Sequence, residues 1–229
     1  MRRILLFDID NTLLWSGGAG GLAMKIAFRD MFGIDNGFAR VEFDGRTDRY
    51  ILAEALRQHG IGGDEPTLLS QFQDRYHALL ADTLRQRQGH LMPGFPQLLE
   101  ALSRYPDLSL GLATGNFKQG ARLKLARYGL DHFFSHYFSI GAFGEESEDR
   151  AEVVRLAIER TAAGVPPKDI LIIGDTPHDI SSALANGVVA VTVATGRYGV
   201  DELYECGAHL VFPDFADWRE AAAMLLGQA

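Results

Sequence analysis

The sequence predicts an α/β protein, a doubly wound parallel sheet with a small helical insert after its first strand. Short apolar runs alternate with amphipathic helical patterns, which is typical of right-handed β–α–β units. One long helical block interrupts this alternation directly after the first run. Runs that are apolar throughout suit strands buried on both faces of a sheet. They lie at residues 3–7, Leu108–Ala113, Tyr137–Ile140, Ile170–Ile173, Val188–Val193 and, more weakly, Leu210–Phe212.

Helical patterns occupy the segments between these runs. Residues Ala151–Ala162 carry apolar side chains at the offsets of one helix face, and Phe95–Arg104 repeats that spacing. A shorter helix, Ile180–Ala185, ends at Asn186-Gly187, a pair typical of a helix C-terminus. Strands that alternate with helices in this way predict right-handed β–α–β crossovers and a doubly wound sheet.

Residues 15 to about 90 contain no convincing strand. A flexible connection, Gly17–Gly21, leads into this segment and is a plausible hinge. We therefore expect residues 1–14 and 91–229 to form the α/β core, and residues 15–90 to form a small α-helical cap over one end of the sheet. Three amphipathic patterns predict the helices of this cap: Leu22–Phe32, Asp48–His59 and Pro66–Arg87.

Composition narrows the possible functions. The chain has 229 residues, 47% of them hydrophobic and 23% charged, which is ordinary for a soluble globular protein. Its net charge of −8 argues against general binding to nucleic acid or to anionic membranes, because both select basic surfaces. No apolar stretch approaches the length of a membrane span, and a lone cysteine forms no internal disulfide. A cytoplasmic protein is the default expectation, and nothing in the sequence indicates an oligomeric state.

Polar residues follow three of the apolar runs, where each predicted strand ends. In an open α/β sheet the ligand crevice lies at the carboxyl ends of the strands. Side chains that are far apart in the sequence are therefore expected to converge there. Each segment alone is also compatible with a strand-end turn or a helix cap, but three together favour a site. The segments are Asp8-Ile9-Asp10-Asn11-Thr12, Thr114-Gly115-Asn116 and Gly174-Asp175-Thr176-Pro177-His178-Asp179.

The acids in these segments suit phosphate chemistry assisted by a metal ion. Mg²⁺ prefers oxygen ligands, which Asp8, Asp175 and the main-chain carbonyl of Asp10 can supply. A carboxylate can attack phosphorus and form an aspartyl-phosphate, the role we assign to Asp8. A second carboxyl group can protonate the leaving oxygen and later activate water, the role we assign to Asp10.

Further groups are needed to hold the transferring oxygens, because phosphoryl transfer depends mainly on positioning and electrostatics. The hydroxyl of Thr114 and the N–H groups near it, at Gly115 and Asn116, are candidates. One cation must also complete the charge balance.

The three polar segments resemble the motifs of the haloacid dehalogenase superfamily of hydrolases. The segment FDIDNTL at Phe7–Leu13 is similar to the D-x-D-x-T motif of that family. The segments LATGN at Leu112–Asn116 and IIGDTPHD at Ile172–Asp179 are similar to its second and fourth motifs. The helical insert lies where the family places its cap domain.

This resemblance implies a Rossmann-like core and Mg²⁺. It also implies Asp8 as nucleophile, Asp10 as acid and base, Asp175 as metal ligand and Asp179 as a supporting residue. The dehalogenase members lack the second acid of the first motif, whereas Asp10 is present here. The chain therefore resembles the phosphatase branch with a helical cap, as in phosphoglycolate phosphatases.

The third motif departs from the family pattern. The family has a lysine shortly before the helix that precedes the fourth motif, but the segment Gly144–Arg150 contains none. Arg150 is our candidate for this cation, and arginine keeps the charge while adding a planar fork of donors. Lys118 and Lys124 are the alternatives, although Lys124 better fits a solvated helix residue.

The substrate-binding residues are less directly encoded. Arg46 lies between two predicted cap helices and is a candidate for contact with the non-reacting end of the substrate. Lys118 is a further substrate-binding candidate. Thr47 or Asp48 is expected to begin the next helix. His178 is interpreted as a loop residue.

These observations favour a Mg²⁺-dependent phosphatase acting on a small phosphorylated metabolite, either a phosphoglycolate-like acid or a sugar phosphate. A sugar phosphomutase is an alternative, because Gly45–Arg49 is loosely similar to a cap element of mutases in the same superfamily. A non-catalytic protein that binds phosphorylated metabolites is an alternative of another class, which the intact acids disfavour.

Overall fold

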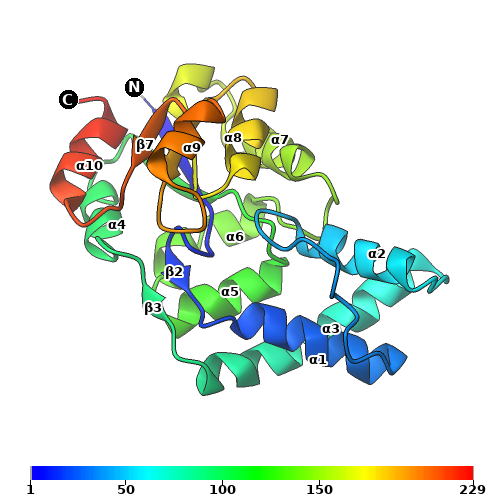
Figure 1. Ribbon diagram of the computed structural model, residues 1–229. Coiled ribbons are helices and arrows are strands. Elements are labelled where there is room, and N and C mark those ends of the chain that lie inside the picture. The colour runs from blue at the N-terminus through cyan, green and yellow to red at the C-terminus, as the bar shows by residue number, and fades with distance from the viewer. Residues whose placement is uncertain (1, 229) are drawn as a thin grey trace.

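A parallel sheet forms the centre of the protein, whose computed structural model describes residues 2–228 (Figure 1). The sheet has five strands in the order β4-β1-β5-β6-β7, and each neighbouring pair is parallel. This order confirms the predicted doubly wound α/β fold. The strands are β1 (Arg3–Phe7), β4 (Leu108–Leu112), β5 (Ile170–Gly174), β6 (Val189–Val193) and β7 (Leu210–Phe212).

Helices flank this sheet on both sides. Helix α7 packs against α8, α4 packs against α10, and the two pairs lie on opposite sides of the sheet in Figure 1. Their bounds are α4 (Gln97–Leu102), α5 (Lys118–Arg127), α7 (Arg150–Thr161), α8 (Pro177–Ala185), α9 (Val200–Glu205) and α10 (Trp218–Leu226), with two short 3₁₀ helices, η1 (Asp131–Phe134) and η2 (Pro167–Asp169).

The start of α8 differs from the prediction, since the helix begins at Pro177 and not at Ile180. Proline suits the first helical position, where its missing N–H group is not needed. The carboxylate of Asp179 accepts hydrogen bonds from the main-chain N and the Oγ1 of Thr176, which caps the helix N-terminus. His178 therefore lies in the first turn of α8 and not in a loop.

The predicted strand at Tyr137–Ile140 is wrong, because these residues form the short helix α6 (Tyr137–Ile140). A four-residue apolar run fits a strand or a buried helical turn equally well. Here Tyr137 and Phe138 are buried and contact the ring of Phe143. A side chain at Gly111 would collide with the Tyr137 ring, so α6 packs directly on β4.

The helical insert lies at one end of the sheet (Figure 1) and consists of α1 (Ala19–Phe32), α2 (Asp48–Gln58) and α3 (Glu65–Gln86). Its three helices share a hydrophobic cluster that includes Phe28, Leu52 and Phe72. Phe117, which precedes α5 of the core, joins the same cluster. The insert is therefore packed onto the core and not merely tethered to it.

Two short strands connect the insert to the core. They are β2 (Leu14–Trp15) and β3 (His90–Leu91), which pair in an antiparallel ladder. Gly17 follows β2 with a φ of 67°, and a Cβ there would lie 2.3 Å from the main-chain oxygen of Gln88. The two passages of the chain are thus in direct contact. Among residues 2–228, no helix is both long enough and apolar enough to cross a membrane.

Candidate active site

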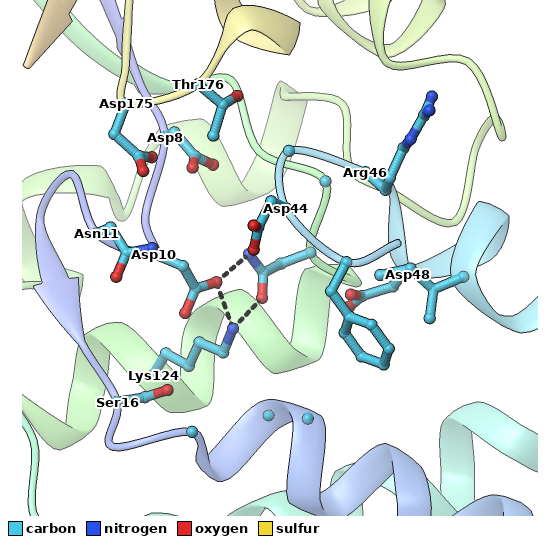
Figure 2. Close-up of a pocket in the computed structure, with 18 of the residues that line it drawn as sticks. Asp8, Asp10, Asn11, Ser16, Asp44, Arg46, Asp48, Lys124, Asp175 and Thr176 are labelled. Atoms are coloured by element: carbon cyan, nitrogen blue, oxygen red, sulfur yellow. Dashed lines mark hydrogen bonds and ion pairs between the residues drawn. The ribbon is translucent and has the colours of Figure 1, made fainter. Parts of the chain in front are cut away.

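A cavity of about 210 Å³ lies between the carboxyl ends of the strands and the helical insert (Figure 2). The register of the sheet explains its position, because Phe7 at the end of β1 lies opposite Leu112 and Ile173. The residues that follow these strands therefore meet at one edge of the sheet. The core lines the cavity with Asp8, Asp10 and Asn116, and the insert with Gly45, Asp48 and Tyr76.

Asp8 is fixed by the turn that follows β1. Its main-chain N donates to the carbonyl of Ile173 at 2.7 Å, which continues the parallel ladder by one residue. The chain then turns sharply, and the main-chain N groups of Leu13 and Leu14 both donate to the Ile9 carbonyl. Asn11 has a φ of 58°, a left-handed conformation that asparagine tolerates better than most residues.

Three buried carboxylates cluster at the strand tips. Asp8, Asp175 and Asp179 each offer an oxygen within 4.8 Å of the others. The oxygens of Asp179 are already engaged, one by Arg150 Nη2 at 2.7 Å and the other by Thr176. In contrast, Oδ1 of Asp8 and Oδ2 of Asp175 are buried without a hydrogen bond.

The donor set fits a divalent metal ion. Two buried carboxylate oxygens without hydrogen bonds are ligands that Mg²⁺ accepts, and the hydrogen bonds within residues 2–228 leave the Asp10 carbonyl without a donor. A Cβ at Gly196 would lie 1.9 Å from Asp175 Oδ2, so the absence of a side chain keeps this oxygen accessible. The residues that fit are Asp8, Asp175 and the carbonyl of Asp10, while Asp179 supports them.

Burial is the main influence on the pKa values of these acids. Burial raises the pKa of Asp8 to about 6, against the opposing effect of Arg150, while Asp179 and Asp10 raise it further. Burial also raises the pKa of Asp175 well above its usual value, and the neighbouring Asp179 and Asp8 add to this shift. A bound cation would favour the ionised form of both groups.

Arg150 reaches the predicted nucleophile. It is buried at the start of α7, and its Nη2 lies 3.0 Å from Asp8 Oδ1. The two hydrogens of Nη2 point to the Ala113 carbonyl and to Asp179. Asp8 is consequently held by charge without an aligned hydrogen bond, which is why its Oδ1 has no hydrogen-bond donor. Nη1 donates to the Gly45 carbonyl at 3.2 Å, so Arg150 also contacts the insert.

The second polar segment forms the side wall of the cavity. Thr114 Oγ1 accepts hydrogen bonds from the main-chain N and Nδ2 of Asn116 and lies behind the lining residues. A Cβ at Gly115 would lie 2.2 Å from the Arg46 main-chain oxygen, so only glycine allows the insert to approach this closely. Asn116 Nδ2 also donates to Asp10 Oδ2 at 2.9 Å.

Lys124 contradicts the expectation of a solvated helix residue. It is 5% exposed, and its Nζ lies 2.5 Å from both Asp10 Oδ2 and Asn116 Oδ1 (Figure 2). One sequence signal marks this position. Gly120 and Ala121 lie four and three residues earlier on the same face of α5, and both are buried. The small residue at Gly120 allows α3 to pack closely on α5, and this packing buries the stem of Lys124 between the two helices.

Asp48 is a second residue whose position the sequence did not reveal. Thr47 caps α2 by accepting from the main-chain N of Tyr50, as expected. The Asp48 side chain, however, turns to the core, where its Oδ2 accepts from the main-chain N of Phe117 at 2.7 Å. Its own main-chain N donates to the Gly115 carbonyl at 2.7 Å. Burial raises the pKa of Asp48 to about 7, against the opposing effect of Lys124.

The two candidate substrate-binding cations, Arg46 and Lys118, differ in their position relative to the cavity. Arg46 lies at the edge of the cavity, with its guanidinium paired to Glu42 at 2.6 Å and stacked over the Tyr50 ring. Figure 2 shows it pointing away from Asp8. Lys118 does not line this cavity, and its Nζ lies 5.7 Å from the centre of the Phe143 ring. The substrate contact of Arg46 stays a prediction, whereas Lys118 lies outside the residues that line this cavity.

Comparisons with known proteins agree with this geometry. The chain is 28% identical over 227 residues to a phosphoglycolate phosphatase of Rhodospirillum rubrum. The matched region covers 95% of this chain and 91% of that protein. It is 25% identical over 233 residues to a probable phosphatase, IndB, of Dickeya dadantii, with coverage of 99% and 96%.

The fold is similar to the crystal structure of CbbY from Rhodobacter sphaeroides in complex with phosphate. The TM-score is 0.73 at 20% sequence identity, over 95% of this chain and 96% of that one. Residues 3–187 match the family described as haloacid dehalogenase-like hydrolase. Since this match spans well over half of the chain, the protein belongs to the haloacid dehalogenase-like hydrolases.

Proposed function

We propose that the protein is a Mg²⁺-dependent phosphatase that hydrolyses a small phosphate monoester through an aspartyl-phosphate on Asp8. One observation carries the proposal. Asp8 has a buried oxygen that accepts no hydrogen bond, with Arg150 on one side and a second such oxygen, on Asp175, nearby. This arrangement suits a nucleophile that works beside a cation and a metal ion.

The first half-reaction transfers the phosphoryl group to the protein. A carboxylate oxygen of Asp8 forms a bond to phosphorus as the bond to the leaving oxygen breaks, and Asp10 gives a proton to that leaving oxygen. Arg150 stabilises the charge on the transferring group. Asp8, Asp175 and the Asp10 carbonyl would hold a magnesium ion, which when bound would supply further positive charge for the phosphate oxygens.

The second half-reaction regenerates the carboxylate. A water oxygen forms a bond to phosphorus, its proton passes to Asp10, and the bond between phosphorus and Asp8 breaks. Closure of the insert over the cavity excludes other water during this step. Two hydrogen bonds between insert and core support such closure here, from Asp48 N to the Gly115 carbonyl and from Phe117 N to the Asp48 carboxylate.

The substrate that fits best is a small metabolite, a phosphoglycolate-like acid or a sugar phosphate. The size of the cavity supports a small molecule, and matched relatives are named phosphoglycolate phosphatase. Three apolar side chains of the insert, Met24, Phe43 and Ile51, line the part of the cavity that the phosphate would not occupy. They would contact the carbon skeleton of the leaving group.

The proposal is tested by measuring phosphate release from a panel that includes 2-phosphoglycolate and several sugar phosphates, with and without Mg²⁺. Asp8→Asn should lower kcat by about 10⁴-fold or more, because it removes the nucleophile itself. Intact-mass spectrometry of the acid-quenched wild-type protein should detect phosphate on Asp8. Turnover that survives Asp8→Asn would contradict the mechanism.

Two alternatives are separated by the same assay. A phosphomutase would isomerise a sugar phosphate without releasing phosphate, so both products are quantified. The pairing of Arg46 with Glu42 gives this alternative no support. A non-catalytic binding protein would show no Mg²⁺-dependent turnover above the Asp8→Asn control on any substrate.

A further inference from the structure

The Asp10 carboxyl group has a partner that the proposed reaction does not yet use. Lys124 donates to Asp10 Oδ2 at 2.5 Å, and its side chain is only 6% exposed. A buried ammonium group requires compensating partners. Both partners of Lys124, Asp10 and Asn116, lie in the candidate active site. If Lys124 served only the folding of the protein, its partners would not need to be two residues of the candidate active site.

The contacts hold Asp10 by one oxygen. Oδ2 accepts from Lys124 Nζ and also from Asn116 Nδ2 at 2.9 Å. Within residues 2–228, no hydrogen bond reaches Oδ1, and the Asp10 side chain is 37% exposed. One oxygen is therefore fixed to the protein, while the other remains open to the cavity.

The surroundings of Lys124 place it in this position. On the side of α1, a Cβ at Gly20 would lie 3.3 Å from Lys124 Nζ, so glycine allows the helix to pass closely. On the side of α3, Tyr76 lies beside Gly120 and Gly20. The remaining charged neighbour is Asp48 of α2, whose pKa the lysine lowers against the effect of burial. Helices of both the insert and the core thus fix the ammonium group against Asp10.

Arg150 already fills the role of the cation next to the nucleophile, because it is the residue that contacts Asp8. Lys124 contacts Asp10 instead. The two buried cations therefore serve different carboxyl groups of the same turn.

On the basis of the proposed phosphatase reaction, we propose that Lys124 is a positioning residue for Asp10. It fixes the carboxyl group through Oδ2, so that Oδ1 is the oxygen directed to the substrate. Oδ1 then gives its proton to the leaving oxygen as the bond from that oxygen to phosphorus breaks. In the second step the same Oδ1 takes the proton of the attacking water.

The test compares two leaving groups. An aryl phosphate such as p-nitrophenyl phosphate expels a stable anion and needs little help from an acid, whereas an alkyl phosphate needs the proton. Lys124→Met should therefore lower kcat/KM for the best alkyl phosphate by about 10²-fold, within the range of general acid catalysis. The value for p-nitrophenyl phosphate should fall by less than about fivefold.

The matched control is Arg122→Met, which removes an exposed cation from the same helix without altering the cavity. It should leave both values unchanged. Equal losses on both substrates in Lys124→Met would show a general structural role and overturn the proposal. Circular dichroism and thermal melts of each variant establish that it is folded.

Two further variants keep the test decisive. In an Asp10→Asn background, adding Lys124→Met should cause no further loss on the alkyl phosphate, since the lysine acts through Asp10. An additive loss would contradict the proposal. If Lys124→Met does not fold, Lys124→Arg retains a donor and should lower only the alkyl value, whereas parallel losses would overturn the inference. A wild-type protein without Asp8-dependent turnover would overturn the proposed function itself and this inference with it.

Discussion

The two ends of the cavity are built differently. At the end where the proposed phosphate would bind, Asp8 and Asp175 follow strands of the core and Asp179 lies in the first turn of α8. Arg150 forms ion pairs with Asp8 and Asp179 there. At the end where the proposed leaving group would lie, Lys124 of the core forms an ion pair with Asp10. Asp48 of the insert also interacts with Lys124 electrostatically. The first end lacks positive charge, and a metal ion would supply it. The second end has its cation built in and depends on the insert being in place.

Replacing Asp175 should affect the phosphate end most strongly. Asp175→Asn removes a charged metal ligand, so we expect about a 10³-fold loss of kcat/KM and a loss of Mg²⁺ affinity of at least about tenfold. Isothermal titration calorimetry measures the affinity without any need for turnover. If Asp175→Asn bound Mg²⁺ as tightly as the wild type, Asp175 would not be a ligand.

Replacing Arg150 should show how far the acids depend on their shared cation. Arg150→Met leaves the carboxylates of Asp8 and Asp179 buried without their partner. Removing one member of a buried ion pair costs about 3–5 kcal/mol, so the free energy of unfolding in urea should fall by that amount at pH 7. Arg150→Lys, which keeps the charge, is the control and should lose less stability. Equal losses would show that charge is not what Arg150 contributes.

Asp48 provides a pH-dependent test at the other end. Its folded-state pKa of about 7 lies above the usual value of 3.8. The folded protein therefore binds more protons than the unfolded chain between these values, and stability falls as pH rises through that window. Asp48→Asn keeps an oxygen for the Phe117 N–H group and does not ionise. Relative to this variant, the wild type should lose about 2–3 kcal/mol of stability between pH 5 and pH 8.

Urea unfolding of both proteins at several pH values measures this difference. If the difference in free energy of unfolding between the wild type and Asp48→Asn stayed constant across the range, the pKa of Asp48 would not be raised by burial.

The smallest expected effect is the pH dependence of metal binding. Asp8 must be ionised to bind a metal ion, and its pKa is raised to about 6. Below that pH the Mg²⁺ dissociation constant should rise by up to about tenfold per pH unit as Asp8 is protonated. Titration calorimetry between pH 5 and pH 8 checks the profile. Asp8→Asn should lose the part of this dependence that comes from Asp8 and keep the part from Asp175, whose pKa is also raised.

The phosphate end was more accessible to sequence reasoning than the leaving-group end. Asp8, Thr114 and Asp175 each follow a buried apolar run, and parallel strands bring their carboxyl ends together without further information. Local patterns therefore predicted both the sheet and the convergence of these residues. The α6 segment shows where local patterns fail, because a four-residue apolar run is compatible with either secondary structure.

The position of Lys124 depends on contacts that no local pattern records. Its partner Asp10 is 114 residues away in the sequence, and the burial of its stem depends on α1 and α3 of the insert. Asp48 is similar, since its local pattern indicates only a helix start. The positions of residues at the border between insert and core can be predicted only when the packing of these two parts is known.

The junction between the insert and the core also bears on how this protein can evolve. Each of three hydrogen bonds across it involves at least one main-chain atom, from Asp48 N to the Gly115 carbonyl, from Phe117 N to the Asp48 carboxylate and from Arg150 to the Gly45 carbonyl. Substitutions at the apolar residues of the insert that line the cavity, Met24, Phe43 and Ile51, would remove none of these bonds. Single mutations at these positions could therefore change the substrate preference without disturbing the docking of the insert. Laboratory selection for new substrates would best begin with these residues.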